Sequence, residues 1–338
     1  MNEKSTVAYP YKIDTSLPEH RHLQLGEPEQ EAIRIIADTA INAMRNYLRS
    51  EGFREVWSPT ITLMAGEDTA TLFTFHYYED LAHLSQTAQP YLEALVSVSS
   101  FKKVFSLTPT YRRERLQDKR HLAEFYSLEV EKGHSDLEDI MSLNERMFSV
   151  GVQRVIEENR KELDILGRDV EKLNFKIPLK RISYDEVVEF SKNRSKEGKK
   201  IKIEWGESLA YELVETLCKE YEAPFFVTHL PEKIRPFYTQ PDPKRKDITL
   251  SYDMFAPYAG EVATGTEKIT DMKLLSERIE KHHLPFNFYR WYVDLRNYDI
   301  PHAGFGMGIE RALQYVTGLE DITKVSLFPR VPFTRPYP

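Results

Sequence analysis

Cationic side chains and one aromatic residue lie close together in the middle of the chain. Arg112 precedes Glu114 by two positions. Arg120 and His121 follow in a polar segment, and Phe125 comes just after it. Cations that are in place beforehand stabilise a reacting polyphosphate, and an aromatic ring can stack on a flat base. These residue types therefore predict a nucleoside triphosphate site, with surface ion pairs and a core position for Phe125 as the plainer alternatives.

A second informative stretch is GFGMGIERALQYVTG, residues 304–318. Gly304, Gly306 and Gly308 come directly before a helical pattern that contains Arg311. Two interpretations are open: a floor without side chains on which a base or phosphate rests beside the guanidinium, or close packing of backbone against backbone. The glycine spacing and the preceding NYDIPHA differ from a dinucleotide-binding loop, which excludes a Rossmann fold.

Two acids could bind a divalent cation. Asp253 and Glu261 lie on neighbouring strand-like segments. Carboxylate oxygens are the ligands that Mg²⁺ prefers, and Mg²⁺ accompanies reacting phosphates. The pair therefore predicts a magnesium site, while solvation of two loop acids is the alternative.

The composition is that of a globular protein with a large core. Of 338 residues, 41% are hydrophobic and 29% are charged. Cys218 is the only cysteine, so neither an internal disulfide nor a thiolate metal site is expected. The net charge of -7 excludes a protein whose whole surface binds nucleic acid. No apolar run could span a bilayer and no secretory signal begins the chain, so a cytoplasmic protein without a membrane span is expected.

Hydrophobic periodicity predicts the elements that position these residues. Apolar residues at helical spacing predict a helix from Pro28 to Gly52, others at 88–100, 135–160, 206–221 and 271–283, and a last one after the glycines. Residues 102–115 and 124–133 are strand-like runs joined by a polar loop, and further strands are predicted near 225–230, 249–255 and 260–265. Arg112 and Glu114 are predicted to share one face of the first run. In the second run Glu129 and Glu131 are predicted on the face opposite to Leu128 and Val130. The fold class is α+β: an antiparallel β-sheet flanked by helices. Residues 1–20 are expected to form an arm and 21–338 one catalytic domain.

Three ordered motifs resemble those of a known family. RHLQL with FREVWSPTIT, then PTYRRERLQDKRHLAEFYSLEVE, then GFGMGIERALQYVTGLEDITKVSLFPR are similar to the three motifs of class II aminoacyl-tRNA synthetases. The stretches GEDTATLF, HLSQTAQPYLEA and IEWGESL resemble the asparaginyl branch of the aspartyl/asparaginyl subgroup. The resemblance spans about residues 20–332. It implies the class II catalytic fold, ATP and Mg²⁺ as cofactors, and a homodimer formed around the strand that bears Pro59.

The resemblance also implies a role for each matching residue. Arg112 would contact the α-phosphate and the activated carboxylate, and Arg311 would cover the adenine and touch the γ-phosphate, which makes these two the catalytic residues. The other nucleotide-binding residues would be Glu114, Arg120, His121, Phe125 and Gly308. The amino acid pocket would contain Glu67, Gln86, Gln89, Glu129 and Lys268. Mg²⁺ would be held by Asp253 and Glu261. Attack of a carboxylate on ATP needs positioned cations and no protein nucleophile.

Departures from the family affect the expected function. The β-barrel that reads the anticodon in the family has no counterpart before RHLQL, so specific binding of a tRNA anticodon is not expected. Leu92 and Glu129 replace a lysine and an aspartate of aspartyl enzymes, as in the asparaginyl branch. Lys268 replaces the family's arginine and offers a point charge in place of a bidentate fork, and the usual small GGS run is ATGT, residues 263–266.

Freestanding cores of this type resemble archaeal asparagine synthetases. The first expectation is therefore activation of aspartate by ATP and transfer of the acyl group to ammonia, with Lys268 holding the α-carboxylate of a substrate that binds turned around. The alternative is an adenylate-forming ligase for another amino acid or acceptor, including an asparaginyl-tRNA synthetase-like enzyme. A non-catalytic dimeric paralogue is a further alternative, and the presence of all the nucleotide-site residues argues against it.

Overall fold

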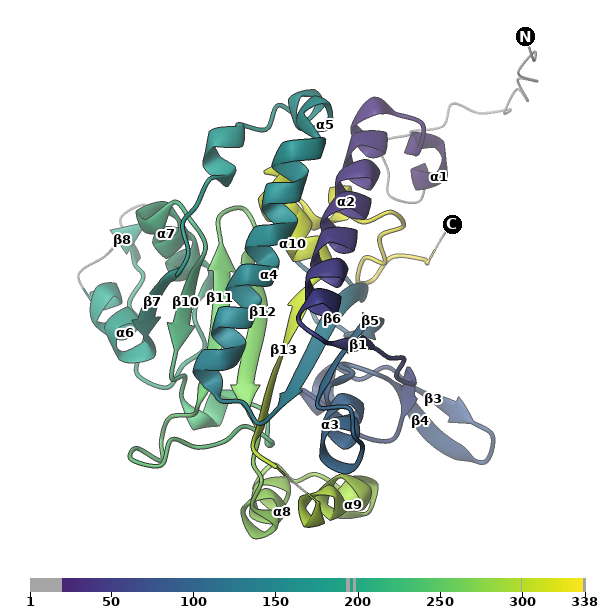
Figure 1. The fold of residues 1–338 in the computed structure, drawn as a ribbon, viewed down its shortest axis with the longest axis vertical. Coiled ribbons are helices and arrows are strands. Elements are labelled where there is room, and N and C mark those ends of the chain that lie inside the picture. The colour runs from purple at the N-terminus through teal and green to yellow at the C-terminus, as the bar shows by residue number, and fades with distance from the viewer. Residues whose placement is uncertain (1–19, 193–194, 197–198, 299, 337–338) are drawn as a thin grey trace.

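An eight-stranded sheet organises the protein (Figure 1). The computed structural model describes residues 20–192, 195, 196, 199–298 and 300–336. In spatial order the strands are β1 (Arg54–Glu55), β5 (Lys103–Tyr111), β6 (Glu124–Gly133), β13 (His302–Gly308), β12 (Gly260–Glu267), β11 (Ser251–Ala256), β10 (Phe225–Thr228) and β7 (Lys180–Ser183). All pairings from β5 to β10 are antiparallel, as predicted.

The sheet as a whole is mixed, because each edge strand pairs in parallel. β1 runs parallel to β5, and β7 runs parallel to β10. Parallel neighbours need a long crossover connection. Helix α3 (Gln89–Val98) lies in the connection from β1 to β5, and α6 (Tyr184–Lys192) and α7 (Tyr211–Tyr221) lie in the connection from β7 to β10.

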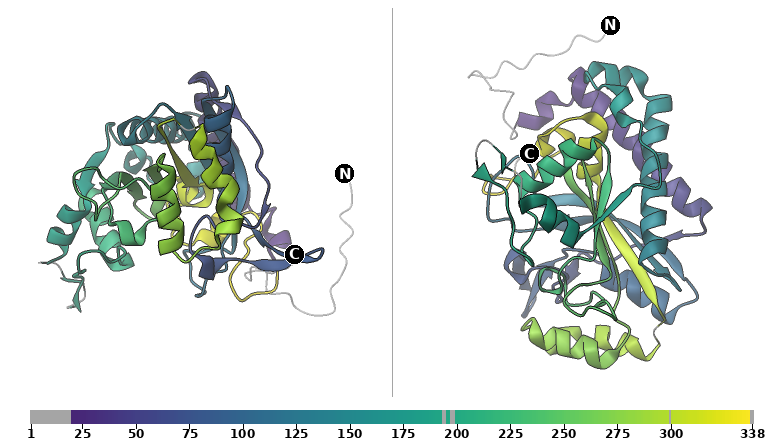
Figure 2. Two further views of the ribbon diagram at one scale, coloured as in Figure 1. Left: turned by 90° about the horizontal axis from the view of Figure 1, so that it is seen from below. Right: turned by 90° about the vertical axis from the view of Figure 1, so that its left-hand side faces the viewer.

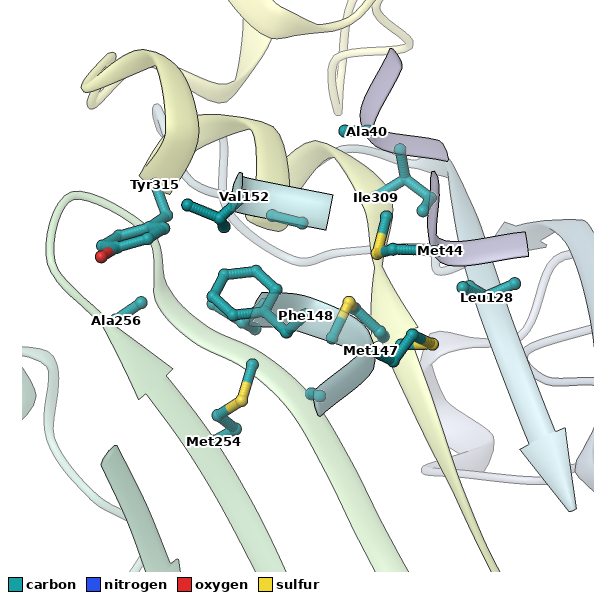
Figure 3. Packing of buried hydrophobic residues seen from close by; sticks show 14 of the residues in the cluster. Ala40, Met44, Leu128, Met147, Phe148, Val152, Met254, Ala256, Ile309 and Tyr315 are labelled. Atoms are coloured by element: carbon teal, nitrogen blue, oxygen red, sulfur yellow. The ribbon is translucent and has the colours of Figure 1, made fainter. Parts of the chain in front are cut away.

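Three helices cover one face of the sheet. These are α2 (Pro28–Ser50), α4 (Leu137–Glu158) and α10 (Ile309–Thr317). Phe148 of α4 lies 5.6 Å from the ring of Tyr315 on α10, between the ring centres. Figure 3 shows Phe148 among methionines and small apolar residues of the helices and strands. This face holds the main hydrophobic core, whose burial supplies the chief driving force of folding.

Alternation along the central strands separates this core from the opposite face. Leu128 and Val130 of β6 are buried in the main core, whereas Glu129 points to the other side. Likewise Met254 of β11 belongs to the main core and its neighbour Phe255 to a separate cluster. Since successive side chains of a strand point to opposite faces, the acids predicted on one face of β6 lie opposite the helices.

Two predicted helices, α3 and α7, flank the opposite face. α3 contacts β5, β6 and β13, and α7 contacts β11 and β12. α7 begins only at Tyr211, later than predicted. Helices α8 (Met272–Lys281) and α9 (Phe286–Asp294) lie together beyond one end of the sheet (Figure 2).

The remaining elements are short. They are α1 (Arg21–Gln24), β2 (Ile61–Thr62), β3 (Thr74–Tyr77), β4 (Asp80–Leu84), α5 (Arg160–Ile165), β8 (Ser195–Lys196), β9 (Lys199–Lys200) and α11 (Ile322–Val325), with 3-10 turns at Thr69–Thr71, Val170–Leu173, Glu232–Ile234 and Leu295–Asn297. None of the helices in the described part of the chain is both long enough and apolar enough to cross a membrane.

Candidate active site

A cavity of about 420 Å³ opens on the face of the sheet opposite the main core. Its lining includes Arg112, Glu114, Arg120, His121, Phe125, Gly308 and Arg311 at one end, which we call the nucleotide end, together with Glu261. The lining also includes Glu67, Gln86, Gln89, Glu129 and Lys268, which we call the amino-acid end. Of the predicted site residues only Asp253 lies outside this lining. Segments that are far apart in sequence therefore meet in one cavity, as the triphosphate prediction requires.

Arg112 lies just past the end of β5 and contacts Phe125. Its guanidinium carbon is 5.5 Å from the centre of the phenyl ring. Its Nε is buried and has no hydrogen-bond partner among the described residues, which fits a site for an anionic ligand. The prediction that Arg112 and Glu114 share a strand face is wrong. β5 ends at Tyr111, and the Glu114 N–H turns back to donate to the Arg112 carbonyl at 2.9 Å.

Arg311 is fixed at the start of α10 by two carbonyl groups. One Nη donates to the carbonyl of Ala259 and the other donates to the carbonyl of Arg120 at 2.5 Å. Ala259 lies in the turn between β11 and β12, and Arg120 lies in the loop after β5. The guanidinium therefore joins two walls of the cavity and does not swing freely.

Asp118 organises the loop that carries the other two cations. Its carboxylate lies 2.9 Å from His121 Nδ1 and 3.2 Å from Arg120 Nη2, and it accepts from the Arg120 N–H at 2.8 Å. Although burial acts in the opposite direction, these contacts lower the pKa of Asp118. The guanidinium carbon of Arg120 also lies 3.9 Å from the centre of the Tyr211 ring. Both side chains line the cavity as predicted, but each already has a partner within the protein.

Thr264 bridges the two predicted magnesium ligands. Its hydroxyl lies 2.8 Å from Asp253 Oδ1 and 3.0 Å from Glu261 Oε1. Arg235, which has no counterpart in the prediction, forms a nearly buried ion pair with Asp253. Burial and the neighbouring Asp253 raise the pKa of Glu261, although solvent in the cavity screens part of this effect because Glu261 is exposed.

This acid pair fits a divalent cation that takes most of its ligands from elsewhere. Two close carboxylates repel one another, and a bound cation would relieve that repulsion. No group of three or more acidic, histidine or cysteine ligands occurs in the described part of the chain. Most ligands of Mg²⁺ at Asp253 and Glu261 would therefore be water or phosphate oxygens.

At the amino-acid end, one primary amide is held between a carboxylate and an ammonium group. Gln89 donates from Nε2 to Glu129 Oε2 at 2.8 Å and accepts on Oε1 from Lys268 Nζ at 2.9 Å. Burial raises the pKa of Glu129, against the hydrogen bond from Gln89 and the charge of Lys268. One acceptor and one donor at this spacing are complementary to a carboxamide.

Gln86 ties the loop of residues 65–72 to the cavity wall. Its Nε2 donates to the carbonyl of Asp68 and to Thr71 Oγ1, each at 2.8 Å, and its Oε1 accepts from the N–H of Glu67 at 3.1 Å. Both amide donors and the amide oxygen are thus engaged within the protein. Gln86 lies where it was predicted, but its contacts hold the loop that carries Glu67.

The glycines of β13 serve two different purposes. A Cβ on Gly304 would lie 1.9 Å from Glu131 Oε2, and a Cβ on Gly306 would lie 2.9 Å from Glu129 Oε2, because these residues are paired across β13 and β6. At Gly308 the nearest atom would be Arg311 Cγ at 3.4 Å, an ordinary contact. Two glycines are therefore required by packing against acids, and the third leaves open floor beside a guanidinium. Close packing is thus confirmed at Gly304 and Gly306, whereas the interpretation that a base or phosphate rests beside Arg311 stays a prediction at Gly308, which lines the cavity.

Comparisons with known proteins agree with this geometry. Residues 14–332 match the family described as tRNA synthetases class II (D, K and N). The chain belongs to this family. It is 40% identical to an asparagine–tRNA ligase of Pyrococcus abyssi over 325 residues, which cover 95% of this chain and 73% of that protein.

Solved class II synthetases share the fold. The asparaginyl-tRNA synthetase of Pyrococcus horikoshii complexed with asparaginyl-adenylate superposes with a TM-score of 0.91 at 38% identity, over 97% of this chain and 74% of that one. The asparaginyl-tRNA synthetase of Entamoeba histolytica in complex with asparaginyl-adenylate has a TM-score of 0.84 at 27% identity, over 96% of this chain and 72% of that one. The predicted resemblance and the predicted fold class are confirmed.

Several polar residues in or beside the cavity were missed by prediction from the sequence. Asp118 and Glu131 lie inside the second motif, so their position in the motif could have indicated them. Arg235 and Tyr211 lie in segments without any motif, and only the folded chain brings them to Asp253 and Arg120. No pattern of spacing in the sequence points to these two.

Proposed function

We propose that the protein is an adenylate-forming ligase that activates asparagine with ATP and transfers the asparaginyl group to tRNA. The observation that carries the choice of amino acid is the amide of Gln89, held between Glu129 and Lys268. A carboxamide that takes the place of the Gln89 amide would offer an N–H donor to Glu129 and a carbonyl to Lys268, whereas a carboxylate would offer Glu129 no donor. Relatives that are asparagine–tRNA ligases support the same choice.

In the proposed reaction an α-carboxylate oxygen of asparagine attacks the α-phosphorus of ATP. The new O–P bond forms as the bond between that phosphorus and the bridging oxygen breaks, and pyrophosphate leaves with the electron pair. Arg112 and Arg311 would stabilise the charge on the phosphates, since fixed cations require little reorganisation during the reaction. A ribose hydroxyl of tRNA then attacks the acyl carbon and AMP leaves.

The other nucleotide contacts complete this proposal. Glu114 would contact the adenine edge, Phe125 would stack on it beside Gly308, and Arg120 and His121 would contact the outer phosphates. Asp253 and Glu261 would hold Mg²⁺, which would neutralise phosphate charge. Glu67, presented by the loop that Gln86 fixes, would contact the α-ammonium group of the amino acid.

The comparisons favour the tRNA-ligase alternative over the first expectation of an asparagine synthetase. Nothing in them supports acyl transfer to ammonia. The named relatives are tRNA ligases, so the expectation that a tRNA anticodon is not bound gains no support either. A cytoplasmic location stays a prediction.

A homodimer is part of the proposal. Pro59 lies between β1 and β2, outside both strands. Trp57 is 92% exposed beside it, and Ile61 and Leu63 are exposed as well. Exposed apolar side chains in one segment are typical of a protein interface. Sedimentation of the purified protein, compared with a Trp57→Glu variant, tests this point.

The proposed reaction is tested by ATP–pyrophosphate exchange with asparagine or aspartate, followed by AMP release with tRNA or with ammonium. We expect asparagine-dependent exchange and aminoacylation of tRNA. Aspartate-dependent AMP release that requires ammonium would contradict the proposal and support an asparagine synthetase. The Arg112→Ala variant, purified in parallel, controls for contaminating synthetases. Absence of exchange together with absence of ATP binding would support a non-catalytic paralogue.

A further inference from the structure

Lys268 is surrounded by protein acceptors. Its Nζ lies 2.9 Å from Gln89 Oε1, 3.7 Å from Glu93 Oε1 and 3.8 Å from Glu131 Oε2. Its side chain is only 1% exposed, and the ring of Tyr238 lies 4.7 Å away. An ammonium group has three N–H donors: one reaches Gln89, whereas the two carboxylate oxygens lie near enough to offset its charge but beyond hydrogen-bonding distance.

The two acids beside Lys268 are each anchored by one oxygen only. Glu93 Oε2 accepts from the Tyr292 hydroxyl at 2.5 Å and from Arg296 Nη2 at 3.1 Å. Glu131 Oε1 lies 2.7 Å from His302 Nδ1. The other oxygen of each acid, Glu93 Oε1 and Glu131 Oε2, is buried and has no hydrogen-bond partner among the described residues.

Both of these oxygens lie near the same ammonium group. A buried carboxylate oxygen without a partner is unfavourable, so a nearby positive charge that offsets it is expected to be held strongly. The glycine at 304 is part of this arrangement, since any side chain there would collide with Glu131 Oε2. The backbone, the acids and the lysine are thus fitted to each other.

We propose, on the basis of the proposed function, that Glu93 and Glu131 are positioning residues. They determine amino acid selectivity by neutralising Lys268. The ammonium group then acts as a hydrogen-bond donor to a neutral carbonyl and not as a receptor for an anion. Glu129 faces the cavity beside Gln89, so the pocket floor repels a second carboxylate. The site thereby accepts side chains that end in a neutral group with an N–H donor, and rejects aspartate.

This assignment predicts that weakening the acids turns Lys268 into an anion receptor. In Glu131→Gln one of the two opposing charges is removed, while the Gln carbonyl can still accept from His302. A unit charge several ångströms away changes ligand selectivity by about tenfold or more at the effective dielectric constant of a protein site. We therefore expect the ratio of kcat/KM for aspartate to that for asparagine, in pyrophosphate exchange, to rise by about tenfold or more. Lys268→Arg, which adds donors that the two acids do not absorb, is expected to raise the same ratio.

The matched control is Glu145→Gln. Glu145 is also a buried acid, but it accepts from the N–H of Leu179 on the far side of the sheet, so its neutralisation is expected to leave the ratio unchanged. Thermal melting establishes which variants fold. If Glu131→Gln does not fold, the ratio of kcat/KM values is measured on Lys268→Arg.

An unchanged ratio in the folded variants, or equal losses for both amino acids, would overturn this inference. The second result would mean that the acids are merely structural. Failure of the proposed function looks different: the unmodified protein would then form no asparaginyl-adenylate at all.

Discussion

The glutamine amides at the amino-acid end and Arg112 at the nucleotide end differ in how far the protein satisfies their polar groups. At the amino-acid end, the amides of Gln86 and Gln89 have protein partners on both the nitrogen and the oxygen, and Lys268 lies among three acceptor oxygens. At the nucleotide end, Arg112 Nε is buried without a hydrogen-bond partner among the described residues, and Gly308 leaves open floor. The two glutamine amides are therefore held in place before a ligand binds, whereas Arg112 lacks a hydrogen-bond partner for its buried Nε among the described residues until an anion arrives.

This difference indicates where selectivity and rate originate. A preformed pocket discriminates because an unsuitable side chain leaves buried groups unpaired. A cation that lacks a partner before binding gains its strongest interaction when the phosphates arrive, and that gain is useful for the rate if it is largest in the transition state. Three changes separate these contributions, and a fourth concerns stability.

The largest expected effect is at the nucleotide end. Arg112→Ala removes the half-buried cation that faces the proposed α-phosphate, and kcat/KM for asparagine-dependent pyrophosphate exchange is expected to fall by about 10³-fold. Arg154→Ala, which removes an exposed arginine of α4 paired only with nearby glutamates, serves as the control and should be unaffected. A loss of less than tenfold in Arg112→Ala would show that this end does not carry the chemistry.

At the amino-acid end, Glu129→Gln replaces the acceptor of the proposed substrate N–H. A hydrogen bond to a charged group contributes about 1.5–3 kcal/mol, so kcat/KM for asparagine should fall by about 10- to 150-fold. ATP binding, measured by calorimetry without the amino acid, should stay unchanged. Loss of ATP binding would mean that the two ends are not independent.

A smaller effect is expected when the loop is released. Gln86→Ala removes the contacts to Glu67, Asp68 and Thr71, and we expect KM for the amino acid to rise about tenfold with little change in kcat. Faster proteolytic cleavage within residues 65–72 should accompany it. Gln153→Ala on α4 is the control, and it should change neither KM for the amino acid nor the rate of proteolytic cleavage. A fall in kcat with unchanged KM would instead place Gln86 in direct contact with the reacting groups.

The smallest effect concerns stability without ligands. Burial raises the pKa of Glu310 to about 7, against hydrogen bonds from backbone N–H groups that include that of Tyr126. Because the folded protein favours the neutral carboxyl, the stability from this group is present at low pH and is lost as the pH rises through about 7. Glu310→Gln should reduce this pH dependence and raise the free energy of unfolding at about pH 8.5 by about 1–3 kcal/mol, as measured by urea denaturation. If the free energy of unfolding has the same pH dependence in the Glu310→Gln variant and in the unmodified protein, this prediction is contradicted.

Prediction from the sequence succeeded where a pattern is local. The alternation of Glu129 and Glu131 with Leu128 and Val130 placed acids and apolar residues on opposite faces of β6, and the structure confirms it. The helices after Pro28 and after Gly308 were likewise fixed by their own apolar spacing. Helical and strand periods repeat over a few residues, so they can be read without knowing the partners.

The limits of that prediction appear where two distant residues pair. Arg235 reaches Asp253 from a segment without any motif, and Glu93 comes from helix α3 to Lys268, which follows β12. The edge strands add a similar case, because their parallel pairing depends on long crossovers and not on their own two to four residues. The sequence by itself determined which faces are polar, which elements exist and which family motifs they carry. Only the tertiary structure decided which charges neutralise one another, because that depends on the register of strands and on side chains brought together from distant segments.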